Sequence, residues 1–219
     1  MKKILLFCAF SPLNSLFCQA EINFDLKLAC NFSTQVYTEP GTQNGKQQWE
    51  TLQTIGAGFL CTKNFGKNSF SARLMYQQKG FNAIVDYISI GTSIDQTTLY
   101  LQNRLDYLTV DLIYRRLFGK KKIQPFFYSG IQGGQLIKER LEIVALNAFE
   151  FENNYRNPQK RSFGLIAGVG IRLNDKAAIE FETVTDLSFS IKNEVVHSRN
   201  WTWSIGLALN ISKLMAKSN

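Results

Sequence analysis

A single histidine, His197, stands in the motif HSRN beside Ser198, and it is the only imidazole in the 219 residues. A histidine that acts as a general base needs a nucleophile within hydrogen-bond reach and an acid that orients its ring. Neighbouring residues on a strand point to opposite faces, so a strand through this motif would separate His197 from Ser198. The sequence therefore predicts no His-based catalytic centre, and we expect the protein not to be an enzyme.

Two cysteines remain after the N-terminal segment, and they offer a second kind of chemistry. Cys30, Cys61 and one histidine have none of the spacing of a metal site, so we expect no metal and no cofactor. The two cysteines fall on neighbouring predicted strands, with Cys30 opposite about Ala57. That offset exceeds the reach of a disulfide, which predicts two free, lipid-facing thiols.

Charged residues of both signs lie on the polar faces of segments that alternate with period two. They could line a selective pore, or form a plug of paired charges whose desolvation is offset by mutual hydrogen bonds. Wide aqueous channels belong to barrels of about sixteen strands, whereas side chains fill a barrel of about eight. We therefore predict a structural plug, formed by Asp25, Lys27, Arg73, Asp111, Arg115, Arg172, Glu180, Glu182 and Asp186.

Eight segments of alternating bulky and polar or small residues must position these side chains. They are 23–33, 54–62, 69–80, 106–116, 122–137, 161–173, 178–189 and 201–211. Small residues on the polar faces, such as Gly168 and Gly206, fit a crowded lumen but would weaken strands that face water. The bulky rows are therefore expected to face lipid, and in the last segment this stripe is Trp201, Trp203, Ile205, Leu207, Leu209 and Ile211.

The connections between these segments alternate in length. Tight turns are expected near 64–68, 118–122 and 174–176, and long polar loops near 38–49, 81–103, 139–159 and 191–199. This layout predicts an all-β fold: an eight-stranded antiparallel up-and-down transmembrane β-barrel with short periplasmic turns and long extracellular loops. Aromatic girdles are expected from Trp201, Trp203, Tyr76 and Phe81 at the outer ends of the strands, and from Phe24 and Phe65 at the inner ends.

The N-terminus has the pattern of a secretory signal. Lys2 and Lys3 precede the apolar stretch Ile4–Phe10, and Cys18-Gln19-Ala20 resembles a cleavage site. Residues 1–20 are thus predicted to be a signal peptide and residues 21–219 the barrel domain of a bacterial outer-membrane protein. Phe17 before Cys18 disfavours lipid anchoring of that cysteine.

The composition excludes other classes of protein. The chain is 45% hydrophobic with a mean hydropathy of −0.13, and it contains no apolar run of the roughly 18 residues that a spanning helix needs. Its net charge of +8 would suit nucleic acid, but an exported protein rarely meets nucleic acid and the basic residues are scattered through turns. We expect no nucleic-acid partner.

Four segments carry a family resemblance. The end of the third strand, LMYQQKG with Tyr76, Lys79 and Gly80, is followed by YLTVDLIYRR, IQPFFYSGIQGG and FGLIAGVGIRL. In this order they resemble the PorT-like outer-membrane β-barrel domain family, often labelled the porin family. Thr109 and Asp111 stand where that family commonly carries Glu and Pro. The polar tail SKLMAKSN also follows the last strand, where many such barrels end on an aromatic residue.

Three functions remain open at this stage. The filled lumen favours a structural or interaction protein that supports envelope integrity, adhesion or partner docking through its loops, and the resemblance to PorT implies a link to protein secretion. The alternatives are a small-solute porin and an outer-leaflet lipid-modifying enzyme that uses His197. The expected partners are outer-membrane lipid and lipopolysaccharide, the barrel-insertion machinery, and a protein bound through the loops.

Overall fold

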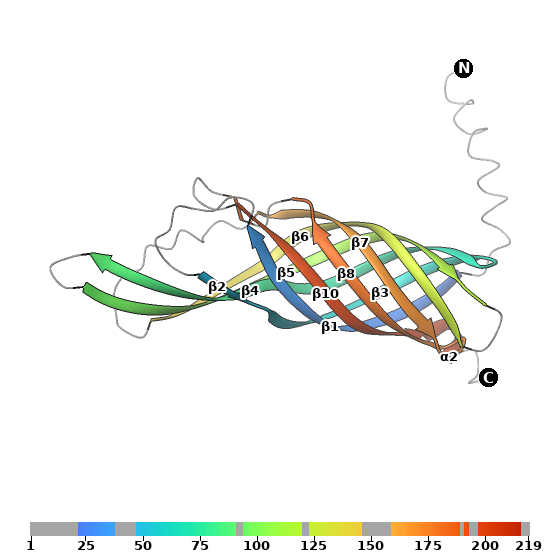
Figure 1. The fold of residues 1–219 in the computed structure, drawn as a ribbon. Helices are drawn as coiled ribbons and strands as arrows, with labels where there is room; N and C mark the ends of the chain where they lie inside the picture. Colours follow the sequence, from blue (N-terminus) through green and yellow to red (C-terminus); the bar gives the residue numbers. More distant parts are fainter. Residues whose placement is uncertain are drawn as a thin grey trace, which may run out of the picture.

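The chain folds into a closed antiparallel barrel of eight strands (Figure 1). The computed structural model describes residues 22–37, 47–90, 94–119, 123–145, 159–188, 191–192 and 197–215. The barrel strands are β1 (Ile22–Tyr37), β3 (Leu52–Phe65), β4 (Asn68–Ile90), β5 (Ile94–Leu117), β6 (Gln124–Ala145), β7 (Arg161–Arg172), β8 (Ala177–Asp186) and β10 (His197–Asn210). Pairing of β1 with β10 closes the sheet, and this confirms the predicted eight-stranded antiparallel barrel. The predicted signal peptide, residues 1–20, lies outside the described residues.

Two short strands and one helix accompany the barrel. β2 (Gln47–Glu50) pairs with β4, and β9 (Ile191–Lys192) pairs with β10. The helix α2 (Ile211–Met215) follows β10 directly, and the Asn210 side chain accepts a hydrogen bond from its Lys213 backbone N–H. Among the described residues, no helix has the length and apolar character needed to cross a membrane.

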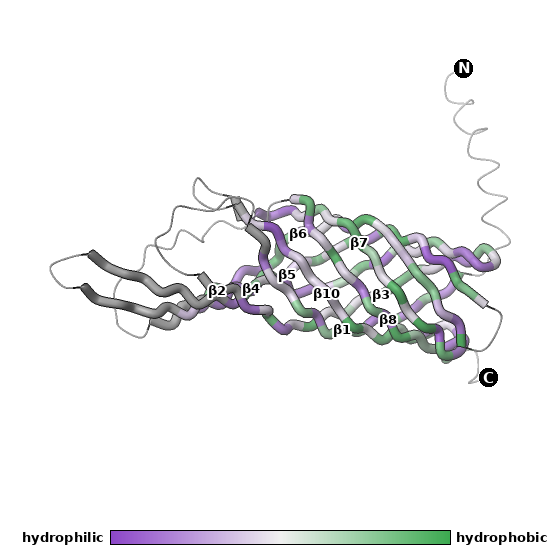
Figure 2. Tube along the Cα trace, in the orientation of Figure 1, coloured by the Kyte–Doolittle hydropathy of each residue, from purple (hydrophilic) through white to green (hydrophobic). Residues whose placement is uncertain are grey.

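Side-chain alternation gives the barrel an apolar outside and a polar inside, and Figure 2 shows the two kinds of residue along each strand. In β8, Ile179 and Phe181 are exposed whereas Glu180 and Glu182 are buried. Ile55 and Phe59 on β3 expose 65% and 61% of their surface. Strands in a soluble barrel would bury such side chains, so this barrel carries an outward apolar belt.

Glycines on the inner face of β7 make room for aromatic rings from β6. A Cβ atom on Gly168 would overlap the ring of Tyr128, and one on Gly170 would overlap the ring of Phe126. Both rings are buried in the lumen. The small residues of β7 thus have a packing reason, because the lumen is too narrow for side chains from both neighbouring strands at this level.

The long strands β4, β5 and β6 continue well beyond the barrel. β4 and β5 stay paired from Asn68 opposite Arg116 to Ile90 opposite Ile94, so the prediction of a long loop at 81–103 is wrong. β6 pairs with β5 as far as Ala145, and β2 lies on the other side of β4. Together the extensions form a projecting sheet, which Figure 1 shows at the end of the barrel opposite α2. It comprises β2 and residues 81–90, 94–103 and 141–145. Parts of the other predicted long loops, 38–46, 146–158 and 193–196, lie outside the described residues.

The projecting sheet begins at a backbone irregularity in β4. Gly80 has a φ of 139°, which only glycine adopts readily, and its N–H donates to the Ser33 hydroxyl at 3.1 Å. The period-two alternation continues through Gly80, so Lys79 and Phe81, two residues apart, share the lumen face and are both wholly buried. The prediction that Phe81 belongs to an outward aromatic girdle is therefore wrong, because Phe81 continues the lumen-facing row of β4 that contains Gln77 and Lys79.

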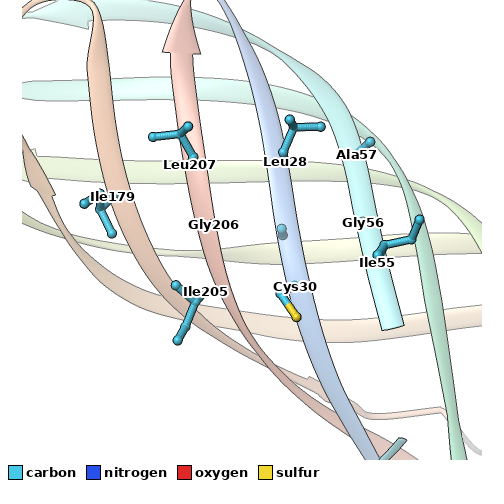
Figure 3. A pocket seen from close by; sticks show the side chains of 10 residues that line it. Leu28, Cys30, Ile55, Gly56, Ala57, Ile179, Ile205, Gly206 and Leu207 are labelled. Carbon is cyan, nitrogen blue, oxygen red and sulfur yellow. The ribbon is translucent and has the colours of Figure 1, made fainter. Parts of the chain in front are cut away.

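The register between β1 and β3 differs from the predicted one. Cys30 lies opposite Ile55, and Cys61 lies opposite Phe24. The prediction placed Cys30 opposite Ala57, which is two residues from its actual partner, because it assumed a loop centre. Both thiols are nevertheless free. Figure 3 shows Cys30 between Ile55 and Ile205 in an open apolar hollow of about 570 Å³ over β3, β1, β10 and β8.

Candidate functional site

The lumen holds a set of ion pairs centred on Glu182. Its carboxylate accepts two hydrogen bonds from the Arg73 guanidinium, at 2.6 and 3.0 Å. It also accepts a bond of 3.1 Å from the Lys27 ammonium and one of 3.0 Å from the Tyr128 hydroxyl. Bidentate pairing of this kind combines strong charge attraction with fixed geometry.

Two further carboxylates complete this set. Asp111 accepts from Arg73 Nε at 2.5 Å. Glu180 lies 2.8 Å from the Lys27 ammonium and 2.6 Å from the Arg115 guanidinium. We call these six residues the central cluster: Lys27, Arg73, Asp111, Arg115, Glu180 and Glu182. Each cation in it contacts a carboxylate, which is the condition under which a buried charge is tolerated.

Aromatic rings pack against the cations of the central cluster. The Arg115 guanidinium lies 4.5 Å from the centre of the Phe126 ring, and the Lys27 ammonium lies 5.8 Å from that of Tyr128. Such contacts add cation–π attraction. Since Gly168 and Gly170 admit these two rings, the glycines of β7 also help to position the charges of the cluster.

A second group of polar residues lies nearer the projecting sheet, and we call it the outer cluster. The Lys79 ammonium donates to Asp186 and to Gln132, both at 2.8 Å. Asn200 donates to the other oxygen of Asp186 at 3.2 Å, and Gln132 donates to Gln77 at 3.2 Å. Asp186, predicted for the lumen, is thus fixed by a lysine from β4.

Lys79 is the lumen charge that the sequence analysis missed. It shares the period-two face of β4 with Arg73 and Gln77, so extending the alternation as far as Gly80 would have identified it. With Lys79 added to the nine predicted residues, acids and bases are equal in number. This balance is what a plug of paired charges requires.

Two predicted lumen residues stand apart from both clusters. Asp25 and Arg172 border a polar cavity of about 150 Å³ at the end of the barrel near α2. Asp25 is buried and the Thr62 hydroxyl donates to it at 3.5 Å, whereas Arg172 is half-buried. The sequence placed them on the correct face, but the structure does not bring them into the central cluster.

Salt bridges cross the lumen and close it. Arg73 with Glu182 and Lys79 with Asp186 both join β4 to β8, which lie on opposite sides of the barrel in the strand order. The side chains of Arg73, Asp111 and Glu182 expose at most 1% of their surface. These three side chains are thus shielded from solvent by the residues around them, which is the arrangement that a plug of paired charges requires.

The remaining predicted positions lie on the outer face or on strand ends. Trp201 is exposed, its ring packs edge to face on Trp203 at 5.2 Å, and its indole N–H donates to Thr183 at 2.9 Å. The predicted stripe also includes exposed and half-buried residues of β10, namely Ile205, Leu207 and Leu209. Ile211, predicted as its last member, is instead the first residue of α2, because β10 ends at Asn210.

The residues considered for catalysis and metal binding are only partly described. His197 pairs with Lys192 of β9, and its side chain lies outside what the structure describes, whereas the neighbouring Ser198 is buried. Over the described ranges, His, Cys, Asp and Glu side chains form no group of three or more that could hold a metal ion.

Comparisons with known proteins give similarity of fold only. No family model matches the chain, and no curated protein matches it. Solved structures with a similar fold include Neisserial surface protein A, with 8% identity, a TM-score of 0.41, and coverage of 87% of this chain and 99% of that one. OprG from Pseudomonas aeruginosa has 14% identity, a TM-score of 0.44, and coverage of 85% and 95%. Ail of Yersinia pestis has 11% identity, a TM-score of 0.39, and coverage of 86% and 99%.

Proposed function

We propose that the protein is a non-conducting barrel of the bacterial outer membrane that holds its projecting sheet at the cell surface as a structural or interaction element. The observation that carries the proposal is the ion-paired plug inside an outward apolar belt. A closed barrel satisfies every backbone hydrogen bond of its wall, which is the condition for crossing lipid with strands. The proposal gives the barrel no catalytic step.

The membrane location rests on the apolar belt and on the N-terminal pattern. Exposed Phe, Leu, Ile and Val side chains cover all eight strands, and lipid is the solvent that favours such a surface. We further propose that residues 1–20 are removed on export and that the barrel-insertion machinery places the mature chain in the membrane. Lipid and lipopolysaccharide are then its first partners.

The projecting sheet supports the interaction role. From Lys138 to Ala145, β6 pairs with β5 on one side, and no described strand lies on its other side. An unpaired strand edge binds extended peptide segments by strand addition. We therefore propose a protein partner that docks on this edge, and a component of protein secretion, as the resemblance to PorT-like barrels implies, is one such partner.

Planar-bilayer recording tests the closed lumen. The refolded protein is expected to give no stable open steps, because the central cluster and the outer cluster both block the lumen. A refolded wide porin in the same bilayer serves as the positive control. Stable open steps from the wild-type barrel would contradict the plug and favour the solute-transport alternative.

Thiol labelling tests the position of the belt. In vesicles, Cys30 and Cys61 are expected to react with a membrane-soluble maleimide and to resist a charged, impermeant one, because both thiols lie on the apolar outer face. A Cys introduced at Glu50, an exposed residue of the projecting sheet, is the matched control and should react with both reagents. If Cys30 reacts equally with the charged and the membrane-soluble reagent, the hollow around Cys30 faces water and not lipid.

A further inference from the structure

Two arginines face each other on the wall of the barrel where the projecting sheet begins. Arg104 on β5 lies directly opposite Arg140 on β6. Like charges at directly opposite positions of an antiparallel pair repel each other and destabilise the sheet. Arg140 is exposed and Arg104 is half-buried, so both guanidinium groups lie within reach of a ligand from outside.

The nearest acid neutralises only one of the two. Asp106 accepts from Arg140 at 3.2 Å through one carboxylate oxygen and from the Gln78 amide at 3.1 Å through the other. This carboxylate is 3% exposed, so it is already fixed and shielded. The Nε atom of Arg104 is buried and has no hydrogen-bond partner among the described residues. Among the described residues, no carboxylate forms an ion pair with Arg104, so its charge is uncompensated.

Other basic residues surround the arginine pair. Lys138 lies opposite Asp106 on β6, and Arg161 begins β7 on the next strand, both of them exposed. The exposed acid on the same stretch of β6 is Glu142, opposite Gln102. We call the four basic residues the basic face: Arg104, Lys138, Arg140 and Arg161. They outnumber the three acids of this region, which are Asp106, Glu142 and the half-buried Glu139 opposite the buried Leu105.

The basic face lies at the edge of the apolar belt. On β5 the outward row runs from Val110 and Leu108, both exposed, to Asp106 and Arg104. On β7 the exposed Phe163 is followed toward the projecting sheet by Arg161. A molecule that lies along the belt with its polar end at this edge would meet the basic face. In a membrane that polar end is a lipid headgroup.

We propose that Arg104 and Arg140 bind a phosphate group of a membrane lipid headgroup, whose acyl chains lie along the belt at Leu108 and Val110. Phosphate oxygens fit the guanidinium fork in a bidentate manner, and the anion removes the repulsion between the two arginines. The site rests on the proposed membrane location, and it assigns to the proposed lipid partner a headgroup contact at two named residues.

Native mass spectrometry of the full chain refolded in detergent micelles tests this site. The probes are lipid A with two phosphates and the same lipid after removal of its phosphates. The wild type is expected to bind the phosphorylated form about 10-fold more tightly or better, since bonds to charged groups are worth that much or more. Arg104→Gln/Arg140→Gln should lose this preference. The matched control, Lys67→Gln/Arg116→Gln, removes two exposed charges at the other end of the barrel and should keep it.

Each other outcome overturns the site. A preference that persists in Arg104→Gln/Arg140→Gln, or that disappears equally in the control, shows that general charge and not this pair selects the lipid. Displacement of the lipid by equimolar inorganic phosphate shows a site for free phosphate. Arg104→Gln alone breaks no ion pair, so it is the second variant if the double variant does not fold. A wild-type chain that does not insert into micelles overturns both this site and the proposed membrane location.

Discussion

Replacing Glu182 with Gln is expected to lower the free energy of unfolding by about 3–5 kcal/mol, the cost of removing one partner from a buried ion pair. The Glu182 carboxylate accepts hydrogen bonds from both terminal nitrogens of Arg73, from the Lys27 ammonium and from the Tyr128 hydroxyl. The Gln amide is neutral and has nearly the shape of the Glu carboxylate, so the loss of stability measures the charge interactions rather than the packing. Asp111 and Glu180 cannot compensate, since each already pairs with a cation of the cluster.

Urea unfolding in lipid vesicles, followed by the mobility difference between folded and unfolded barrel on unheated gels, measures this loss. Glu50→Gln is the matched control, because Glu50 is exposed on β2, and surface changes usually stay within about 0.5 kcal/mol. If both variants unfold at the same urea concentration as the wild type, the central cluster does not hold the barrel together.

Replacing Gly80 with Ala is expected to cost roughly 3 kcal/mol or more, as the sum of backbone strain at a positive φ and overpacking. An added Cβ would overlap the backbone carbonyl oxygen of Asn103 on β5, and backbone cannot move aside as a flexible side chain can. Relief requires β4 to shift against β5, which would also disturb the Ser33 hydrogen bond and the burial of Phe81.

The same unfolding measurement applies, with Gly133→Ala as its control. A Cβ on Gly133 would come no closer than 3.9 Å to its nearest neighbour, Val110 O, so this variant should change stability by less than about 0.5 kcal/mol. Equal stability of Gly80→Ala and Gly133→Ala would show that the irregularity in β4 is not specified by glycine.

The pleat of a strand made the two faces of the barrel predictable. Because successive side chains alternate, Glu180 and Glu182 could be separated from Ile179 and Phe181 by sequence position alone. The pairing of charges could not be predicted in the same way. Arg73 forms a hydrogen bond with Glu182, which lies 109 residues later in the chain. This contact depends on the stagger of every strand between β4 and β8, and the alternation of residues within one strand does not predict that stagger.

The failures of sequence analysis have local causes. The apolar alternation stops where β4 leaves the belt, so residues 81–103 resemble a loop although backbone pairing continues to Ile90 and Ile94. Phe81 was assigned to the wrong face because it was placed by its nearness to the outer end of a strand, although the alternation puts it on the same face as Arg73 and Lys79. The pairing of Cys30 was displaced because the count started from an assumed loop centre near residues 43 and 44, a position that the alternation of the strands does not determine.

With the projecting sheet at the cell surface, as proposed, the unbroken course of β4 and β5 determines how far the protein reaches from the membrane. At about 3.3 Å per residue, the stretch from Phe81 to Ile90 extends roughly 30 Å beyond the point where the apolar belt ends. The same strands form the barrel wall, so no hinge separates this extension from its anchor. A molecule that binds the end of the projecting sheet is therefore held at a fixed distance from the bilayer. A pulling force on that molecule is transmitted along β4 and β5 directly to the barrel wall.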